Sequence, residues 1–354
     1  MKIASIVGAR PQFIKLVPLS KEIRKFFEEI VIHTGQHYDY EMNKQFFDEL
    51  NIPEPDYNLG VGSRTHAEQT GKMMMGIEKI LQKEEPELVV VFGDTNSTLA
   101  GALASVKLHI PVAHVEAGLR CFDKKVPEEI NRILTDHCSD FLFCPTKTSV
   151  ENLKKEGIKE NIHLVGDIMV DTLKQNLKIA EQKSRILDKL KLEPGEYFLA
   201  TIHRAENTDN YENLKNITEA FCEIKKIVLP LHPRTEKKLK EYKLFEKLCR
   251  NIKIIPPISY LDMLILEKNA KKILTDSGGI QKEAYILKVP CITLREKTEW
   301  VETVEDGWNI LVGTLKEKII KNANKFMPNI EDHKMRFGDG KTSERIVKIL
   351  KEIK

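Results

Sequence analysis

The fold of this chain is decided by the segment Ile273-Leu274-Thr275-Asp276-Ser277-Gly278-Gly279-Ile280-Gln281-Lys282-Glu283-Ala284. Apolar and β-branched residues run into Asp-Ser-Gly-Gly, and helix-forming residues follow at once, which predicts a strand, a tight turn and a helix N-terminus. Ser277 and the first free amides of the helix would donate hydrogen bonds to an anion, and Gly278 and Gly279 lack the Cβ atoms that would keep a phosphate away. Glu283, one helical turn beyond Gly279, is placed to bond a hydroxyl near that phosphate, which suggests the ribose of a nucleotide. A helix that is merely capped by Ser or Asp after a buried strand has the same local sequence.

Short apolar runs alternate with amphipathic helical stretches throughout the chain, which is the pattern of a parallel sheet in the α/β class. The expected strands are 2–7, 30–33, 88–92, 111–115 and 141–144, and then 197–202, 227–231, 252–255, 272–275 and 290–294. A polar, Lys-rich stretch from Leu173 to Leu192 separates the two series. We therefore expect two doubly wound domains that face each other, with ligands at the carboxyl ends of the strands and an active site in the cleft between the domains.

Composition is that of an ordinary globular protein, with 354 residues, 41% hydrophobic and 31% charged residues. A formal net charge of +3 is too small to indicate a nucleic-acid or membrane surface. The six cysteines are scattered without metal-ligand spacing, which is typical of reduced thiols in a cytoplasmic protein. The first apolar run is too short for a signal peptide, and no run approaches the roughly 18 apolar residues of a transmembrane helix.

Charged side chains follow the strands of the first half at the points where the strands end. Arg10 and Lys15 follow the first strand, in an expected loop from Gly8 to Lys15 that enters a helix and lacks the glycine pattern of a P-loop. Two cations beside a helix N-terminus suit a diphosphate. Asp94 and Glu116 follow two further strands, and Glu128 opens a helix after Pro127. Three acidic groups would then converge on one rim. The alternatives are a solvated charged turn at Arg10 and Lys15, a helix N-cap for Asp94 and a favourable helix-dipole position for Glu128.

The second half contributes His203 and Arg204 at one strand end and His232 at another. Either histidine could instead be a core residue satisfied by a backbone carbonyl. Carboxylates from one half, with histidine, arginine and a phosphate loop from the other, form a site for proton transfer on a phosphate-linked substrate.

Several motifs in this order resemble the non-hydrolysing UDP-N-acetylglucosamine 2-epimerases, and the resemblance covers nearly the whole chain. The motifs are Gly8-Ala9-Arg10-Pro11, Thr34-Gly35-Gln36-His37, Gly93-Asp94-Thr95, His114-Val115-Glu116-Ala117-Gly118-Leu119-Arg120, Pro127-Glu128-Glu129-Ile130-Asn131-Arg132, His203-Arg204 and Asp276-Ser277-Gly278-Gly279-Ile280-Gln281. The resemblance implies a GT-B fold with Rossmann-like domains at 1–172 and 173–338 and a C-terminal helix within 339–354 that packs back on the first domain. It implies a cytoplasmic homodimer that needs no cofactor and no metal.

The resemblance also implies the reaction, which inverts C2 of the sugar by anti elimination of UDP to a 2-acetamidoglucal and re-addition of UDP. The C2 proton is not next to a carbonyl, so departure of UDP from C1 must assist its removal. The implied catalytic group is Asp94, Glu116, Glu128 and His203, and the carboxylate that takes the C2 proton stays open. By the same resemblance, Ser277, Gly278 and Gly279 would bind phosphate, Glu283 would bind the ribose, and the backbone around Ile258 would bind the uracil edge. Three residues are expected near the diphosphate: Arg10, Lys15 and His203. The expected substrate-binding set is completed by Arg132, Arg204 and His232.

Two departures from the family pattern bear on the substrate and on regulation. Where the family tends to have Thr-Glu-Arg-Pro, this chain has Thr298-Glu299-Trp300-Val301, so a substrate-side arginine is missing. The same stretch resembles the sister branch that epimerises UDP-2,3-diacetamido-2,3-dideoxyglucuronate, whose extra carboxylate Arg120, Arg132 or His232 could receive. Both substrates stay open. The spacing across Tyr38 to Gln45 also differs from that of the allosterically activated bacterial enzymes, so we do not expect that regulation.

Three other activities are compatible with a UDP-sugar site. A retaining GT-B glycosyltransferase would transfer the sugar to an acceptor, a hydrolysing epimerase would release free sugar and UDP, and a nucleotide-sugar-binding regulator would bind without turnover.

Overall fold

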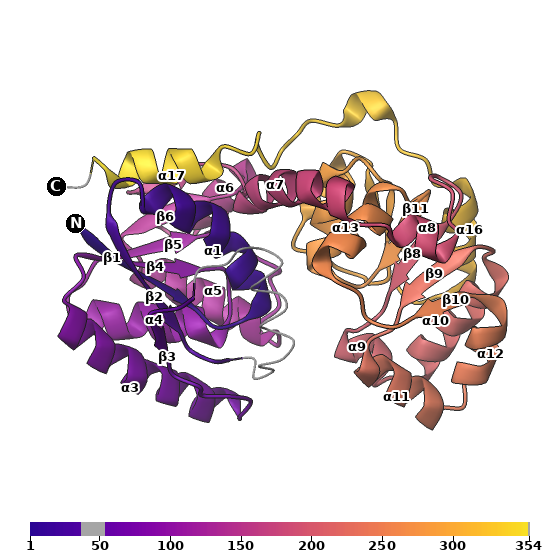
Figure 1. Cartoon of the computed structure of the whole chain (residues 1–354), viewed down its shortest axis with the longest axis horizontal. Coiled ribbons are helices and arrows are strands. Elements are labelled where there is room, and N and C mark those ends of the chain that lie inside the picture. Colours follow the sequence, from indigo (N-terminus) through magenta and orange to yellow (C-terminus); the bar gives the residue numbers. More distant parts are fainter. Residues whose placement is uncertain (37–53, 353–354) are drawn as a thin grey trace. The chain divides into compact units, whose positions relative to one another are not determined.

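The structure, a computed structural model, describes residues 1–36 and 54–352, so His37 and the stretch Tyr38 to Gln45 lie outside the described residues. The chain forms two compact units, Met1–Gln175 with Arg336–Lys354, and Asn176–Met335. We refer to them as unit 1 and unit 2. Each contains a parallel sheet with helices on both faces (Figure 1). The α/β class and the two doubly wound sheets expected from the sequence are confirmed.

Unit 1 is built on a seven-stranded sheet in which all neighbouring strands are parallel. Its strand order is β3-β2-β1-β4-β5-β6-β7, so the direction of winding reverses between β1 and β4. Ligands of doubly wound sheets bind outside the carboxyl ends of the strands at such a reversal. The strands are β1 (Lys2–Val7), β2 (Glu28–His33), β3 (Tyr57–Asn58), β4 (Leu88–Phe92), β5 (Val112–Val115), β6 (Phe141–Cys144) and β7 (Ile162–Leu164).

Helices cover both faces of the unit 1 sheet. Helices α3 and α4 pack on one face around Met73, Ile77 and Ala100, and α1 and α17 lie against each other on the other face (Figure 1). The carboxylate of Asp171 accepts hydrogen bonds from the backbone N–H groups of Thr342, at 3.1 Å, and Ser343, at 2.9 Å, and so holds the start of α17. The helices are α1 (Arg10–Ile23), α3 (His66–Glu84), α4 (Asn96–Lys107), α5 (Pro127–Cys138), α6 (Lys147–Lys155), α7 (Ile168–Lys183) and α17 (Thr342–Leu350).

Helix α1 begins earlier than the sequence suggested. We expected a loop from Gly8 to Lys15, but the helix starts at Arg10. Pro11 occupies the first turn, where proline has a favourable φ and where its missing N–H would have no intrahelical partner. Arg10 and Lys15 therefore both project from α1 rather than from a loop.

Unit 2 repeats the same architecture with six parallel strands in the order β10-β9-β8-β11-β12-β13. The winding reverses between β8 and β11. The glycine-containing segment from Ile273 to Ala284 begins in β11 and continues into helix α14, so it lies at this reversal. The strands are β8 (Phe198–Thr201), β9 (Ile227–Pro230), β10 (Lys253–Ile255), β11 (Lys272–Thr275), β12 (Cys291–Thr293) and β13 (Asn309–Leu311).

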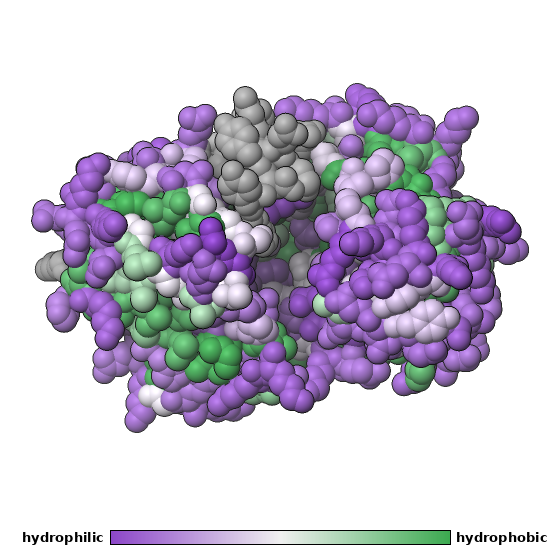
Figure 2. Space-filling model, turned by 90° about the horizontal axis from the view of Figure 1, so that it is seen from below, coloured by the Kyte–Doolittle hydropathy of each residue, from purple (hydrophilic) through white to green (hydrophobic). Residues whose placement is uncertain are grey.

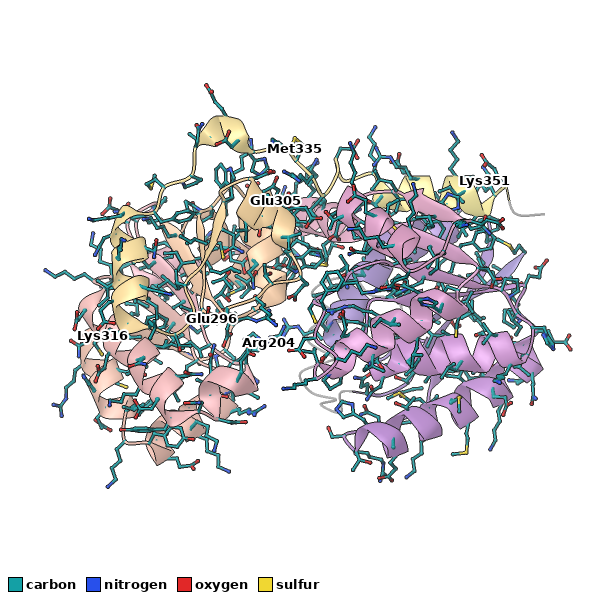
Figure 3. All side chains as sticks on the ribbon, turned by 180° about the vertical axis from the view of Figure 1, so that it is seen from behind. Arg204, Glu296, Glu305, Lys316, Met335 and Lys351 are labelled. Carbon is teal, nitrogen blue, oxygen red and sulfur yellow. The ribbon has the colours of Figure 1, made fainter. Side chains whose placement is uncertain are left out.

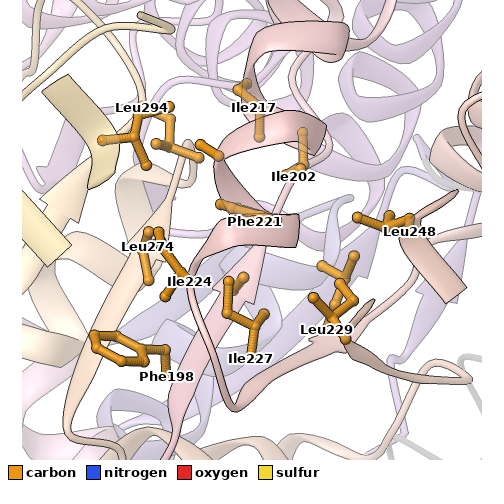
Figure 4. Close-up of a cluster of buried hydrophobic side chains, with 14 of the residues drawn as sticks. Phe198, Ile202, Ile217, Phe221, Ile224, Ile227, Leu229, Leu248, Leu274 and Leu294 are labelled. Atoms are coloured by element: carbon orange, nitrogen blue, oxygen red, sulfur yellow. The ribbon is translucent and has the colours of Figure 1, made fainter. Parts of the chain in front are cut away.

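A continuous hydrophobic core joins one face of the unit 2 sheet to α10 and its neighbours. Phe221 and Ile217 of α10 pack with Phe198 and Leu274 from the sheet (Figure 4). The helices of the unit are α8 (Ile186–Leu190), α9 (Ala205–Thr208), α10 (Tyr211–Glu223), α11 (Pro233–Glu241), α12 (Phe245–Asn251), α13 (Tyr260–Lys268), α14 (Gly278–Ile286), α15 (Val301–Glu305) and α16 (Lys316–Lys325), with a 3-10 turn at Ile330–Asp332.

Hydrophilic side chains cover most of the face shown in Figure 2, and hydrophobic side chains form smaller patches among them. Among the residues that the structure describes, no helix has both the length and the apolar character needed to cross a membrane.

Candidate active site

Asp94 lies just beyond the end of β4 and is held by an arginine. Its Oδ2 lies 2.6 Å from Nη2 of Arg132, whose Nη1 lies 3.1 Å from Oε2 of Glu129. Thr95, not Asp94, caps helix α4, so the alternative that Asp94 serves only as a helix cap does not apply. The carboxylate of Asp94 is 30% exposed, whereas the Arg132 side chain is 9% exposed. A nearly buried guanidinium therefore orients a carboxylate that solvent can still reach.

Glu129 anchors this arginine from the first turn of α5. Burial alone would favour its neutral form. The backbone N–H groups of Cys121 and Phe122 and the guanidinium of Arg132 outweigh that effect, and the pKa of Glu129 lies below its usual value. A charged Glu129 keeps Arg132 directed at Asp94.

Glu116 follows β5, the neighbour of β4 in the sheet, and forms an ion pair with Lys15 of α1. The backbone of Glu116 has a φ of 77°, a left-handed conformation that is uncommon for a residue with a side chain. A Cβ atom at Gly93 would lie 3.2 Å from Nζ of Lys15, so the glycine leaves room for the ammonium group. The cation that we expected near a diphosphate thus lies beside a candidate base.

Behind these residues lies a buried polar network that the sequence analysis did not assign. The ring of His114 lies between Oδ1 of Asp136, 2.7 Å from Nδ1, and the carbonyl oxygen of Gly93, 2.7 Å from Nε2. Asp136 also accepts a hydrogen bond from Nη1 of Arg120 at 2.7 Å. Burial favours the neutral form of Asp136, but the charges of His114 and Arg120 hold its pKa below the usual value. The network fixes the carbonyl that immediately precedes Asp94. Arg120 is committed to this network, which does not favour its proposed use as a substrate-side cation.

The two remaining predicted residues of unit 1 lie on helix starts. Arg10 is the first residue of α1 and is half-buried, and Glu128 is in the first turn of α5, also half-buried. Glu128 lies one helical turn before Arg132. The structure thus brings Asp94, Glu116 and Lys15 to the carboxyl edge of one sheet.

In unit 2, Asp276 joins the ends of β11 and β8. This carboxylate is fully buried and accepts hydrogen bonds from the backbone N–H of His203, at 3.1 Å, the backbone N–H of Arg204, at 3.1 Å, and Nδ2 of Asn207, at 3.0 Å. Nδ1 of His203 lies 3.3 Å from Oδ1 of the same carboxylate. Asp276 therefore sets the position of both predicted residues at the end of β8.

His203 is 45% exposed, yet its surroundings disfavour the charged form. Desolvation lowers its pKa first, and the charges of Arg204, His232 and Arg234 act in the same direction, while Asp276 opposes them. The net pKa lies below the ordinary value. The imidazole is thus predominantly neutral at neutral pH, and its free nitrogen can accept a proton.

The turn from Ser277 to Gly279 has the geometry predicted for it. Ser277 is the N-cap of α14 and its Oγ accepts a hydrogen bond from the N–H of Ile280 at 3.4 Å. A Cβ atom added to Gly279 would meet no atom nearer than Ser277 Oγ at 3.8 Å, so space beside this residue is open. A Cβ atom at Gly278, by contrast, would lie 2.2 Å from Oε1 of Glu299.

The residues predicted to bind the ribose and the uracil, Glu283 and Ile258, also lie in unit 2. Glu283 is on α14 and almost fully buried, and its Oε1 accepts a hydrogen bond from the hydroxyl of Tyr260 at 2.9 Å. Ile258 is in the loop before α13 and is half-buried. Tyr260 positions the Glu283 carboxylate and was not predicted from the sequence.

His232 has a different local role from that of His203. It is exposed and caps α11, because its Nδ1 accepts a hydrogen bond from the N–H of Arg234 at 3.2 Å. The alternative that His232 is a core histidine is therefore wrong. Its charge acts on His203, as described above.

Arg204 and the β12 loop form a charged cluster at the same edge of the unit 2 sheet. Nη1 of Arg295 lies 3.1 Å from Oε2 of Glu299, and Nη2 of Arg204 lies 4.0 Å from Oε1. Figure 3 labels Arg204 and, in the loop beyond Arg295, Glu296. Neither Arg295 nor the position of Glu299 was predicted, because both depend on the neighbouring strand ends rather than on local pattern. Within residues 1–36 and 54–352, no group of His, Cys, Asp and Glu side chains could hold a metal ion.

Comparison with known proteins agrees with this fold. The sequence profile of a family described as UDP-N-acetylglucosamine 2-epimerase matches residues 21–351. The chain is 62% identical to a UDP-N-acetylglucosamine 2-epimerase homolog of Methanococcus maripaludis, over 100% of both chains. It is 47% identical to the UDP-2,3-diacetamido-2,3-dideoxy-D-glucuronate 2-epimerase of Pseudomonas aeruginosa, again over 100% of both. The crystal structure of Methanocaldococcus jannaschii UDP-GlcNAc 2-epimerase in complex with UDP-GlcNAc and UDP is 55% identical, with a TM-score of 0.92, over 99% of this chain and 100% of that one.

The two Rossmann-like sheets and these matches define an isomerase of the carbohydrate epimerase class with a GT-B fold. Within that class, the chain belongs to the UDP-N-acetylglucosamine 2-epimerase family.

Proposed function

We propose that this protein interconverts UDP-N-acetylglucosamine and UDP-N-acetylmannosamine without hydrolysis, by anti elimination and re-addition of UDP. The observation that carries the proposal is the identity of 56%, over 99% of both chains, with a UDP-N-acetylglucosamine 2-epimerase of Methanocaldococcus jannaschii. The product would serve the synthesis of a surface polysaccharide or another glycan. We further propose a homodimer located in the cytoplasm, where the free thiols would stay reduced.

The proposed reaction needs a base for the C2 proton and stabilisation of the departing diphosphate. In elimination, a base removes the proton from C2, the electron pair forms the C1–C2 double bond, and the C1–O bond breaks with its electrons leaving on UDP. In re-addition, UDP oxygen attacks C1 and a proton is delivered to the opposite face of C2. The products balance, since no atom or electron is lost to an outside partner.

The carboxylates of unit 1 fit the proton transfers. Arg132 orients Asp94, and Lys15 forms an ion pair with Glu116, so a cation holds each of these acids in place. Glu128, one turn before Arg132, is the third candidate. We assign proton transfer at C2 to this group without choosing among its members.

The residues of unit 2 fit the diphosphate and the nucleoside. Ser277, the free amides at the start of α14 and Arg204 would bind phosphate, with Arg10 and Lys15 of unit 1 as the further cations in the proposal. Glu283, held by Tyr260, would bind the ribose hydroxyls, and the backbone at Ile258 the uracil. His203 would lie near the diphosphate, beside the cations that stabilise the departing oxygen.

A second substrate, UDP-2,3-diacetamido-2,3-dideoxyglucuronate, is favoured by one feature. Trp300 replaces the family arginine after Thr298-Glu299, and it lies under the ammonium group of Lys282, 4.0 Å from its ring centroid. Of the three candidates for the extra carboxylate, Arg120 and Arg132 are held by carboxylates of unit 1, and His232 is exposed. The tryptophan takes the place of a charged side chain, so the substrate must be tested directly.

Proton NMR in deuterium oxide separates these functions. With the correct substrate, we expect deuterium at C2 and a new manno-configured anomeric signal, without release of free sugar. Asp94→Asn should reduce this rate at least about a hundredfold while UDP still binds, because acid–base groups contribute about 10²- to 10⁴-fold. Glu78→Gln, on the exposed face of α3, is the matched control and should keep the rate. Transfer to an acceptor, release of free sugar, or UDP binding without exchange at C2 would each contradict the proposal.

A further inference from the structure

The side chain of Glu299 occupies the space beside the first residue of α14. Its Oε1 would be 2.2 Å from a Cβ atom placed on Gly278, far closer than side-chain atoms approach one another. Gly278 therefore leaves room for a carboxylate of the protein itself. Gly279, with open space beside it, is the glycine that leaves room for a ligand.

Two arginines, from the ends of the strands on either side of β11, also lie close to this carboxylate. Arg295, after β12, and Arg204, after β8, lie 3.1 Å and 4.0 Å from its two oxygens. Glu206 makes a further contact of 3.2 Å with Nε of Arg295. The side chains of Glu299 and Arg295 are 9% and 12% exposed, so water screens their charges only in part.

The N-terminus of a helix and two guanidinium groups together attract an anion. In this structure the carboxylate of Glu299 lies at that position. A phosphate that enters beside Gly279 would meet the same arginines and the same helix N-terminus while a fixed negative charge remains within the cluster. The two anions would repel each other and would compete for the same donors.

We propose that Glu299 is an internal counter-anion that competes with the diphosphate of the substrate and limits how tightly UDP is held. This inference rests on the proposed function, since it concerns the same UDP site. Competition between Glu299 and the diphosphate would assist the proposed reaction. UDP must leave C1 and then return to it, and a site that binds the free diphosphate too tightly would hold UDP at the expense of re-addition.

A purely structural role for Glu299 makes the opposite prediction. If the carboxylate served only to hold Arg204 and Arg295 in place, its loss would disorder two phosphate-binding cations and weaken UDP binding. Glu299→Gln removes the charge but keeps the shape and a hydrogen-bond acceptor. The sign of the change in UDP affinity therefore distinguishes competition from support.

The test is calorimetric titration of the full-length protein with UDP, for the wild type and for Glu299→Gln. We expect the variant to bind UDP about tenfold more tightly, as for the removal of one partly screened charge from a shared site. Glu299→Ala should change affinity in the same direction if the glutamine variant is poorly folded. Glu296→Gln, an exposed carboxylate in the same loop, is the matched control and should leave the dissociation constant unchanged.

Unchanged or weaker UDP binding by Glu299→Gln, with normal UDP binding by the wild type, would overturn the competition and leave the proposed function standing. Failure of the wild type to bind UDP would overturn both. A second measurement addresses the contact itself: Gly278→Ala should lower the melting temperature of the wild type more than that of Glu299→Ala. Equal losses in both backgrounds would show that Glu299 does not occupy the space at Gly278.

Discussion

The sharpest prediction concerns Asp276, a residue that touches no proposed substrate atom and yet fixes His203 and Arg204. Asp276→Asn replaces one acceptor oxygen by an NH₂ group. An NH₂ group in place of Oδ2 would face the backbone N–H of Arg204 and Nδ2 of Asn207, and one in place of Oδ1 would face the N–H of His203, which would keep only its 3.2 Å contact with Oδ2. The substitution thus removes the charge and leaves buried donors without an acceptor.

The magnitude follows from the hydrogen bonds that are lost. A hydrogen bond to a charged group contributes about 1.5–3 kcal/mol, so the loss of one or two lowers the free energy of unfolding by about 1.5–6 kcal/mol. Domains are typically stable by about 5–15 kcal/mol, so the variant should still fold. Displacement of His203 should reduce kcat/KM at least about a hundredfold, equivalent to about 2.7 kcal/mol. Because the charge of Asp276 raises the pKa of His203, its removal should also move the histidine limb of the pH profile to lower pH.

Urea unfolding and the epimerisation rate between pH 5.5 and 9 measure these effects. Asp209→Asn is the matched control, because this 45% exposed carboxylate pairs with Arg234 at the surface beyond the same strand end. It should change kcat/KM less than about twofold, as for exposed ion pairs. Wild-type kcat/KM and an unshifted pH profile for Asp276→Asn would refute the positioning role.

Two further predictions concern stability. Glu267 is fully buried, and burial and the nearby Glu283 raise its pKa well above 4.5, so its contribution to stability is present below pH 4.5 and is lost as pH rises through the raised pKa. In urea unfolding, Glu267→Gln should therefore be more stable than the wild type by at least about 1 kcal/mol at pH 8, with no such gain at pH 4. Parallel curves of unfolding free energy against pH for the two proteins would contradict this account. Phe221→Ala should lower the unfolding free energy by about 3–5 kcal/mol, because the ring is fully buried in the core of unit 2. Tyr211 is 45% exposed on the same helix, so Tyr211→Ala should lower the unfolding free energy far less. Equal losses of unfolding free energy would contradict the assigned core.

The sequence predicted the fold well where local signals were strong. Continuous apolar runs such as Leu88–Phe92 and Lys272–Thr275 are strands with the expected bounds. The strands Tyr57–Asn58, Ile162–Leu164 and Asn309–Leu311 were not predicted, since two or three residues carry no measurable alternation. Pro11 was not recognised as a residue of the first helical turn, so α1 was expected to start too late.

The candidate site was predictable to the extent that it follows strand ends. Asp94 and Glu116 lie at the carboxyl ends of adjacent strands, as their positions after apolar runs indicated. Their partners were not predictable, because Arg132 reaches Asp94 from a helix 38 residues away and Glu299 reaches Gly278 from a neighbouring strand end. Such contacts depend on tertiary geometry that no local pattern encodes. The roles assigned to the site residues stay predictions.

Because α17 belongs to unit 1, the order in which the two units are synthesised differs from the order in which they can complete their folding. Unit 1 is mostly made of the first residues to leave the ribosome, but α17, whose start is held by Asp171, is the last helix of the described chain to emerge. Unit 1 therefore cannot complete its fold until all of unit 2 has been translated. During that time the surface of α1 that α17 covers stays exposed. Unit 2, which is continuous in sequence, can finish folding before the unit that precedes it.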